Sequence, residues 1–281
     1  MNGKKHTREY GRIRMEKHLN VRTADPAAVA HLREALDIPA LVARVLVARG
    51  MDDVEEARDF LEPDIARDWH DPSLIPHMDE AAERIEAALD AHERIMVFGD
   101  FDVDGITSTT LMVKGLEALG ASDVETLIPR RDDEGYGLTD SALERVFECM
   151  PDLLITVDCG ITARDEVARL IEAGIAVVVT DHHEPGDEIP VGVPVVDPKC
   201  DEECPSFNLA GVGVALKLIC ALGCRKGQPD LWRDFVDLAM LGTISDRMRL
   251  RGENRAIVVE GLARLNDHPR PGIAAALALL P

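Results

Sequence analysis

The sequence predicts an α/β fold, a mostly parallel sheet with helices on both faces, preceded by a small helical N-terminal segment. Short apolar runs at residues 95–98, 153–157 and 175–180 have the length and composition of buried strands. Segments with apolar residues at helical spacing lie between these runs. Strands that alternate with helices form parallel sheets, because each connection places a helix on one face of the sheet.

The first part of the chain lacks strand-like segments. Residues 25–61 carry a helical pattern of apolar positions, and prolines predict a loop over 63–78. An amphipathic helix follows at 79–92. We therefore expect a helical N-terminal segment over residues 1–78 and an α/β domain over residues 79–281.

The rest of the expected domain alternates in the same way. Strands are expected over 124–128 and 193–196. Helices are expected to begin near Thr107 and to cover 113–119, 140–149, 163–173, 212–222, 231–241, 254–265 and 273–280.

An acidic motif follows the first strand. Asp100, Asp102 and Asp104 stand at alternate positions, and alternate side chains of an extended chain share one face. Their mutual repulsion is relieved if a divalent cation lies between them, because hard cations prefer oxygen ligands. One such motif fits equally well with a solvated acidic turn that caps a helix.

Further polar groups follow the later apolar segments. Asp158 ends the second strand, Asp181-His182-His183 end the third, and Asp246 follows another apolar segment. The carboxyl ends of parallel strands line the ligand crevice of such sheets. Aspartate and neutral histidine suit manganese, magnesium or zinc. The full set therefore predicts a metal site.

Composition limits the other functions. The formal charge of −21 argues against a general nucleic-acid coat but leaves room for a focused basic groove. We expect Arg131 to serve such a groove and Arg225-Lys226 to be solvated. Six scattered cysteines do not predict a disulfide framework, and their spacing does not favour a zinc site. No apolar run approaches the roughly 18 residues of a membrane span, and Met1 to His6 lack a signal region, so a cytoplasmic location without a membrane partner is expected.

With these motifs the chain resembles the DHH phosphoesterase superfamily, and within it the RecJ-like single-strand-specific exonucleases. The superfamily is named for the motif seen here as Asp181-His182-His183. The other matching stretches are 43–50, 56–63, 99–109, Pro129-Arg130-Arg131 with 134–138, 157–160, 209–215, 241–246 and 252–255.

The resemblance implies a metal-dependent 5′-to-3′ exonuclease on single-stranded DNA, in DNA repair and recombination. It implies two divalent ions, manganese or else magnesium. Asp102 and Asp158 would hold the first. The second would be held by Asp104, Asp158, His182 and Asp246. His183 would lie by the phosphate or near the first ion, with Asp181 and Asp100 as orienting groups.

The same resemblance suggests substrate contacts. Arg131 would clamp a phosphate. Tyr136 would either stack a base or anchor its loop. Gly211 and Gly213 open a helix whose amide groups would bind phosphate.

Single-stranded DNA is thus the expected partner, with a single-strand-binding protein or a helicase as further partners. RecJ-like chains usually continue into a DHH-associated domain and an oligonucleotide-binding fold, and neither is recognised in this sequence. Two departures from the pattern are Phe98, where many superfamily members have histidine, and the charged Arg247-Met248-Arg249. Two alternatives remain: a phosphodiesterase for short oligonucleotides or cyclic dinucleotides, and a non-catalytic replication scaffold.

Overall fold

The computed structural model describes residues 22–132 and 134–279, so the first residues of the polar N-terminus lie outside the described part. The chain forms two compact units, Met1–Leu61 and Glu62–Pro281. This division comes earlier than the expected boundary at 78. The segment between these points belongs to the larger unit because Ile65 and Ile75 are buried in its core. It contains α4 (Ile65–Asp68), which packs on α11 (Gly252–Asp267), and the short 3-10 helix η1 (Pro72–Leu74), which packs on α9 (Gly211–Arg225).

The smaller unit consists of three helices in its described residues. These are α1 (Pro26–Leu36), α2 (Ala40–Ala48) and α3 (Val54–Leu61). Asp25 caps α1 by accepting a hydrogen bond from the backbone N–H of Ala28, and Pro26 occupies the first helical position, where no N–H is needed. The core of this unit is formed by Leu32, Ala43, Leu46, Met51 and Ala57.

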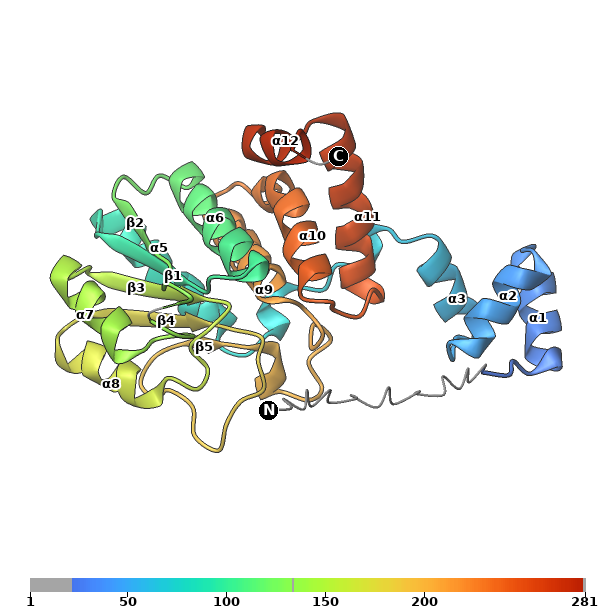
Figure 1. Ribbon diagram of the computed structural model, residues 1–281, viewed down its shortest axis with the longest axis horizontal. Coiled ribbons are helices and arrows are strands. Elements are labelled where there is room, and N and C mark those ends of the chain that lie inside the picture. Colours follow the sequence, from blue (N-terminus) through green and yellow to red (C-terminus); the bar gives the residue numbers. More distant parts are fainter. Residues whose placement is uncertain (1–21, 133, 280–281) are drawn as a thin grey trace, which may run out of the picture. The chain divides into compact units, whose positions relative to one another are not determined.

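The larger unit is built on a five-stranded sheet (Figure 1). The strands are β1 (Ile95–Gly99), β2 (Val124–Leu127), β3 (Leu153–Val157), β4 (Ala176–Thr180) and β5 (Val195–Val196). Their order is β2-β1-β3-β4-β5, and every pairing is parallel. The expected parallel sheet is thereby confirmed.

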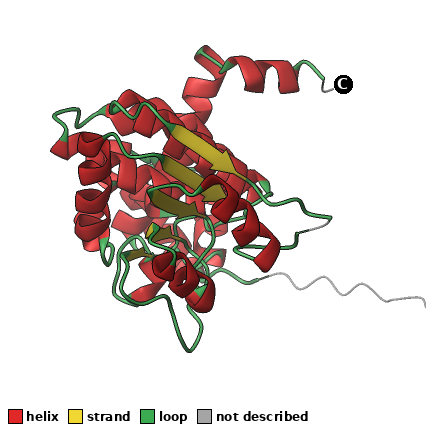
Figure 2. Ribbon diagram, turned by 90° about the vertical axis from the view of Figure 1, so that its left-hand side faces the viewer, coloured by secondary structure: helices red, strands yellow, loops and turns green. Residues whose placement is uncertain are grey.

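Alternate residues of the strands enter two separate cores. Ile95 and Val97 of β1 pack with residues of α5 (Met78–Ala91), α6 (Val103–Ala118), α9 and α10 (Val236–Ser245). Met96 and Phe98 pack with α7 (Asp140–Cys149) and α8 (Arg164–Glu172). Figures 1 and 2 show helices on both faces of the sheet, as the apolar strands predicted.

The C-terminal part adds helices beyond the sheet. It contains α10, α11 and α12 (Pro271–Leu277), and the short 3-10 helices η2 (Pro198–Cys200) and η3 (Leu231–Phe235) precede this layer. The helix expected over 231–241 is in fact η3 followed by α10, because the chain passes through a 3-10 turn that buries Trp232 and Phe235. Within the described ranges, no helix combines the length and the apolar composition needed to cross a bilayer.

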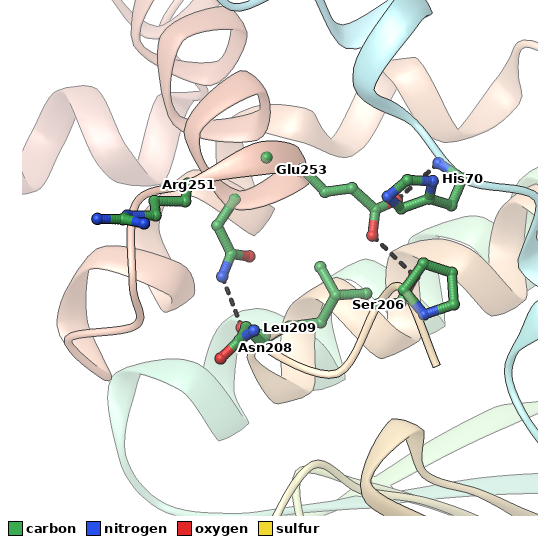
Figure 3. Close-up of a pocket in the computed structure, with 9 residues that line it drawn as sticks. His70, Ser206, Asn208, Leu209, Arg251 and Glu253 are labelled. Carbon is green, nitrogen blue, oxygen red and sulfur yellow. Dashed lines mark hydrogen bonds between the residues drawn. The ribbon is translucent and has the colours of Figure 1, made fainter. Parts of the chain in front are cut away.

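A buried ion pair joins α9 to α11. The Glu253 carboxylate accepts hydrogen bonds from the Lys217 ammonium, from the Ser206 hydroxyl and from the backbone N–H of His70. Lys217 also lies 3.6 Å from the ring centre of Trp69, so its charge is fully enclosed. A cavity of about 200 Å³ opens beside this network (Figure 3). By contrast, Arg225 and Lys226 of the expected solvated turn form ion pairs with acids of α5.

Candidate metal centre

The candidate site lies where the strand order reverses. The chain passes from β1 to β2 on one side, and then places β3 on the other side of β1. The connections after β1 and β3 therefore leave the sheet in opposite directions and open a crevice at their carboxyl ends. Asp100, Asp102 and Asp104 follow β1, and Asp158 follows β3, so the expected acids do lie at this edge.

The first acidic motif is not extended, which corrects the expectation of a shared strand face. Strand β1 ends at Gly99, and α6 begins at Val103 rather than near Thr107. Asp102 is the N-cap of α6 and accepts a hydrogen bond of 3.0 Å from the backbone N–H of Gly105. Because the chain turns here, the acids divide. Asp100 and Asp102 group with Asp158, whereas Asp104 groups with His182 and Asp246. Asp158 also groups with His182 and His183.

Asp104 is held by the start of α9. Its two carboxylate oxygens accept backbone hydrogen bonds from Gly211, at 2.8 Å, and Val212, at 3.0 Å. A Cβ atom on Gly211 would lie 2.4 Å from Oδ1 of Asp158, so only glycine fits there. Gly213 packs against the Leu209 side chain. These contacts differ from the expected phosphate-binding role, because the helix start is used to position carboxylates.

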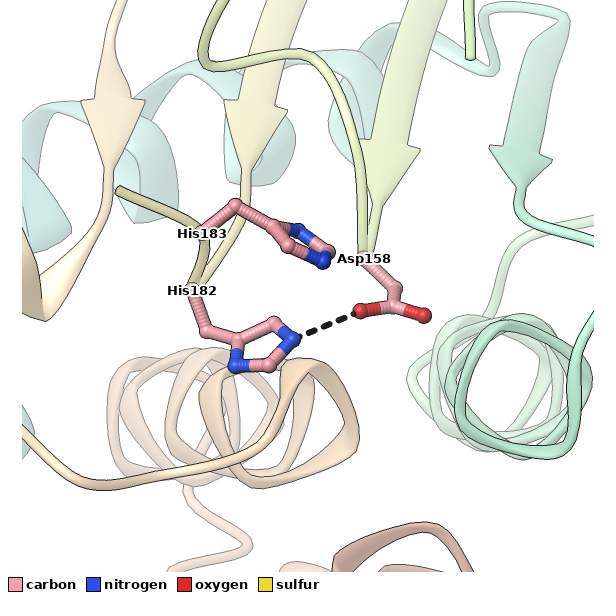
Figure 4. Close-up of side chains that lie close together, drawn as sticks. All are labelled: Asp158, His182 and His183. Carbon is pink, nitrogen blue, oxygen red and sulfur yellow. Dashed lines mark ion pairs between the residues drawn. The ribbon is translucent and has the colours of Figure 1, made fainter. Parts of the chain in front are cut away.

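His182 faces three carboxylates. Its Nε2 lies 3.1 Å from Oδ1 of Asp158 (Figure 4). The same Nε2 lies 3.8 Å from Oδ2 of both Asp104 and Asp246. Both ring nitrogens of His182 are buried without a hydrogen-bond partner, and so is Oδ1 of Asp158. Asp158 itself adopts a left-handed backbone conformation, with φ of 61°. Lone pairs from several elements thus converge on one place without satisfying one another.

The carboxylates of this cluster resist ionisation. Burial, with the nearby Asp158 charge in addition, raises the pKa of Asp104 to about 8. Burial, together with the charges of Asp181 and Asp102, raises the pKa of Asp158 to about 9. Burial also raises the pKa of Asp100, whose Oδ1 has no partner. A divalent cation would favour the ionised forms and supply the missing partner, so this donor set fits such an ion.

Asp181 organises the histidine loop. Its Oδ1 accepts hydrogen bonds from the backbone N–H of His182 at 2.7 Å and from Nδ1 of His183 at 2.7 Å, while its Oδ2 accepts one from the N–H of Ile161. Although burial opposes ionisation, these bonds hold the pKa of Asp181 below its usual range. The bond to Asp181 in turn raises the pKa of His183 to about 9, so this half-exposed imidazole is cationic at neutral pH.

Asp246 reaches the cluster from a helix rather than from a strand. It is the C-cap of α10, and the half-buried carboxylate approaches His182 from the helical layer. Arg247 and Arg249, the charged residues that depart from the family pattern after Asp246, are exposed and lie outside the core. Met248 packs against the core instead.

The expected substrate residues lie beside the acids. The Arg131 guanidinium lies 4.5 Å from the ring centre of Phe101, within the first acidic motif. The Tyr136 hydroxyl lies 3.3 Å from the backbone oxygen of Asp158 and 3.2 Å from Nδ1 of His183. Half of the tyrosine remains exposed, so the residue anchors its loop and still presents an aromatic face. Positive φ values at Gly135 and Gly137 form the turn around it.

Two residues of the site were not expected. A Cβ atom on Gly242 would lie 2.4 Å from Oδ1 of Asp104, which shows that α10 needs glycine to approach this carboxylate. Asp197 is fully buried near the histidines, and burial raises its pKa to about 6. The role of Gly242 is visible only in the folded structure. The sequence did contain a signal for Asp197, because this acid follows β5 in the same way that Asp158 follows β3.

Comparison with known proteins agrees with this geometry. The chain is 44% identical to the single-stranded-DNA-specific exonuclease RecJ of Bacillus subtilis over 255 residues, which are 90% of this chain and 31% of the relative. It is 36% identical to the RecJ of Salmonella typhimurium over 279 residues, 95% of this chain and 47% of the relative. The chain thus spans less than half the length of these curated relatives.

Solved structures give the same result. The crystal structure of RecJ in complex with Mn2+ from Thermus thermophilus matches with a TM-score of 0.71 and 38% identity, over 86% of this chain and 34% of the other. A crystal structure of exonuclease RecJ bound to manganese matches with a TM-score of 0.64 and 45% identity, over 68% of this chain and 48% of the other. The family model described as the DHH family, N-terminal domain, matches residues 94–243. This match covers more than half of the chain and includes most of the clustered acids and both histidines, and the chain therefore belongs to the DHH family.

Proposed function

We propose that this chain is a metal-dependent exonuclease that hydrolyses the phosphodiester bonds of single-stranded DNA from the 5′ end. The observation that carries the proposal is the convergence of Asp104, Asp158, His182 and Asp246 with unpartnered donor atoms at the switch point of the sheet. The choice of single-stranded DNA as the substrate follows from the similarity of the chain to exonucleases that are named as specific for single-stranded DNA.

Two divalent ions fit the way in which the acids divide. Asp100 and Asp102 lie with Asp158 on one side, and Asp104, His182 and Asp246 lie on the other. Asp102 and Asp158 would hold one ion, and Asp158 would also serve the second. Manganese or magnesium is the proposed metal, because related RecJ structures contain Mn2+ or Mg2+. Bound ions of this kind activate water and neutralise charge on the phosphoryl oxygens.

The protein's own cations would orient the strand. Asp181 holds the His183 ring through Nδ1, so the other nitrogen of this ring can donate a hydrogen bond to a phosphate oxygen at the mouth of the site. Arg131, stacked on Phe101, offers a guanidinium close to the same acids. The exposed half of Tyr136 offers a surface on which a base can stack.

The charge of the chain favours a single strand as substrate. A formal charge of −21 leaves few cations for the two backbones of a duplex. We propose a role in DNA repair and recombination, on strands opened by a helicase or covered by a single-strand-binding protein. A cytoplasmic location is part of the proposal and is consistent with six free cysteines.

A nuclease assay tests the proposal. Long single strands labelled at either end would be incubated with Mn2+ or with a chelator, alongside blunt duplex, closed circles, short oligonucleotides and cyclic dinucleotides. We expect short products from the 5′-labelled end, only with metal, and none from the Asp158→Ala variant. Activity in excess chelator would refute the metal assignment. Equal cleavage of closed circles would refute the exonuclease, and exclusive cleavage of the short substrates would show a small-substrate phosphodiesterase.

A further inference from the structure

Asp197 is a buried carboxylate with an unused oxygen. It directly follows β5 and is fully buried. Its Oδ1 accepts a hydrogen bond of 2.8 Å from the backbone N–H of Lys199 and so caps η2. Its Oδ2 is buried without a partner. The Lys199 ammonium does not satisfy it, since that group lies 3.1 Å from Glu184.

The Nδ1 ring nitrogen of His182 also lacks a hydrogen-bond partner. Its Nε2 points at the carboxylates of the metal centre, and its other ring nitrogen, Nδ1, is also buried without a partner. Figure 4 shows the ring with one nitrogen directed at Asp158 and the other turned away from it. A histidine that binds a metal through one nitrogen normally donates its other N–H to a carboxylate, a carbonyl or a water.

The sheet brings the two residues together. Thr180 of β4 is paired with Val196 of β5, and the backbone N–H of Asp181 donates to the carbonyl oxygen of Val196. Asp181 and Asp197 therefore leave the sheet side by side, and His182 is the residue after Asp181. Burial raises the pKa of Asp197 and the charge of Asp181 adds to this rise, while the Lys199 N–H and the nearby His182 imidazole act against it.

We propose that Asp197 is the positioning residue of His182: its Oδ2 accepts a hydrogen bond from one bridging water, which in turn accepts the Nδ1 proton of His182, and so fixes the ring with Nε2 free for the metal. This inference rests on the metal site proposed above. It explains why a carboxylate is buried at a position where capping η2 uses only one of its oxygens. Asp197 itself touches neither metal nor substrate.

Mn2+ binding measured by calorimetry tests the inference on four variants. Asp197→Ala removes the acceptor, and we expect about a 10- to 100-fold loss of Mn2+ affinity. Asp197→Asn keeps an acceptor oxygen and should stay within a few-fold of the wild type. Asp71→Ala is the matched control, because Asp71 also caps a 3-10 helix that starts with proline but lies outside the acid cluster. Asp158→Asn should lose binding, and it reports on the metal site itself.

Nuclear magnetic resonance of the histidine rings gives a second readout that does not use activity. In the Mg2+-loaded chain with 15N-labelled histidine, His182 should carry its proton on Nδ1, and that proton should exchange slowly with solvent. Asp197→Asn should preserve this signal and Asp197→Ala should lose it.

The outcomes separate the two proposals. If the wild type binds no Mn2+, the metal site fails and this inference fails with it. If the wild type binds and Asp197→Ala binds equally well, only the role of Asp197 is refuted. Equal losses in Asp197→Asn and Asp197→Ala also refute it. If Asp197→Ala does not fold, the resonance measurement on the wild-type chain decides the matter. Rapid solvent exchange of the His182 Nδ1 proton in that chain would refute the role of Asp197.

Discussion

Nε2 of His182 lies 3.1 Å from Oδ1 of Asp158, yet no hydrogen bond joins these two buried side chains. Their geometry directs both sets of lone pairs toward the space between them. Such an arrangement has a cost in a protein interior, because each group has lost its water without gaining a partner. A cation between the two would satisfy both, and the predictions below follow from this.

The two adjacent histidines should have different functions. His182 is buried among three carboxylates, whereas His183 is half-exposed and bound to Asp181. We expect His182→Ala to lower Mn2+ affinity by at least about tenfold, the scale of losses at such sites. His183→Ala should retain most of the affinity but lose turnover. Calorimetry and single-turnover cleavage measure the two effects. Equal losses of metal in both variants would contradict this division.

Gly242 should control the position of Asp104. A Cβ atom at this position would lie 2.4 Å from Oδ1 of Asp104 and 2.7 Å from Oγ1 of Thr107, so Gly242→Ala must displace the carboxylate or α10. We expect weaker Mn2+ binding together with about 1–3 kcal/mol lower stability from overpacking. Gly272→Ala in α12 is the control, since nothing lies within 4 Å of the position that its new methyl group would take. That change should leave Mn2+ binding unaltered, and a wild-type affinity in Gly242→Ala would contradict the prediction.

The stability of the metal-free chain should depend on pH in a direction set by the buried acids. The pKa values of Asp104 and Asp158 rise from 3.8 to about 8 and about 9 on folding. At pH values between the unfolded and the folded pKa, each of these two carboxyl groups is protonated in the folded state and ionised in the unfolded state. The contribution of both acids to the free energy of unfolding is therefore full below about pH 4 and is lost as pH rises toward 9.

Urea denaturation in excess chelator from acidic to alkaline pH measures this contribution. We expect the decline in stability with pH to be steeper in the wild type than in the Asp104→Asn/Asp158→Asn double variant. Added Mn2+ should stabilise the wild type more as pH rises, because binding must displace the protons. Parallel pH profiles for the two proteins would show that these acids do not carry the effect.

The buried ion pair behind the site gives a prediction on stability alone. Lys217→Met leaves the Glu253 carboxylate buried with its cation removed. Removal of one partner from such a pair costs about 3–5 kcal/mol. Arg225→Met breaks the more exposed pair with Glu86 and should cost no more than about 1 kcal/mol. Thermal and urea unfolding compare the two variants, and similar losses in both would contradict the special role of Lys217.

The sequence predicted those parts of the fold that depend on local pattern. The apolar runs became β1, β3 and β4, and the acids behind them reached one edge because parallel strands end together. The division of the acids was not predictable in this way, since it depends on Asp102 capping α6 and so bending the chain. Gly242 was also hidden, because its role depends on a helix from a distant part of the sequence approaching Asp104.

The cluster draws its side chains from two layers of the larger unit. Asp102, Asp104, Asp158 and His182 lie in the segments that directly follow strands β1, β3 and β4, but Asp246 is the C-cap of α10. An ion held by Asp104, His182 and Asp246 would join chain segments that are far apart in sequence, and because it binds the folded chain it would stabilise that state over the unfolded one. Separation of α10 from the sheet would then require the ion to leave first. Metal should consequently slow unfolding more than it speeds folding, and resistance to proteolysis becomes a measure of metal occupancy even where no nucleic acid is present.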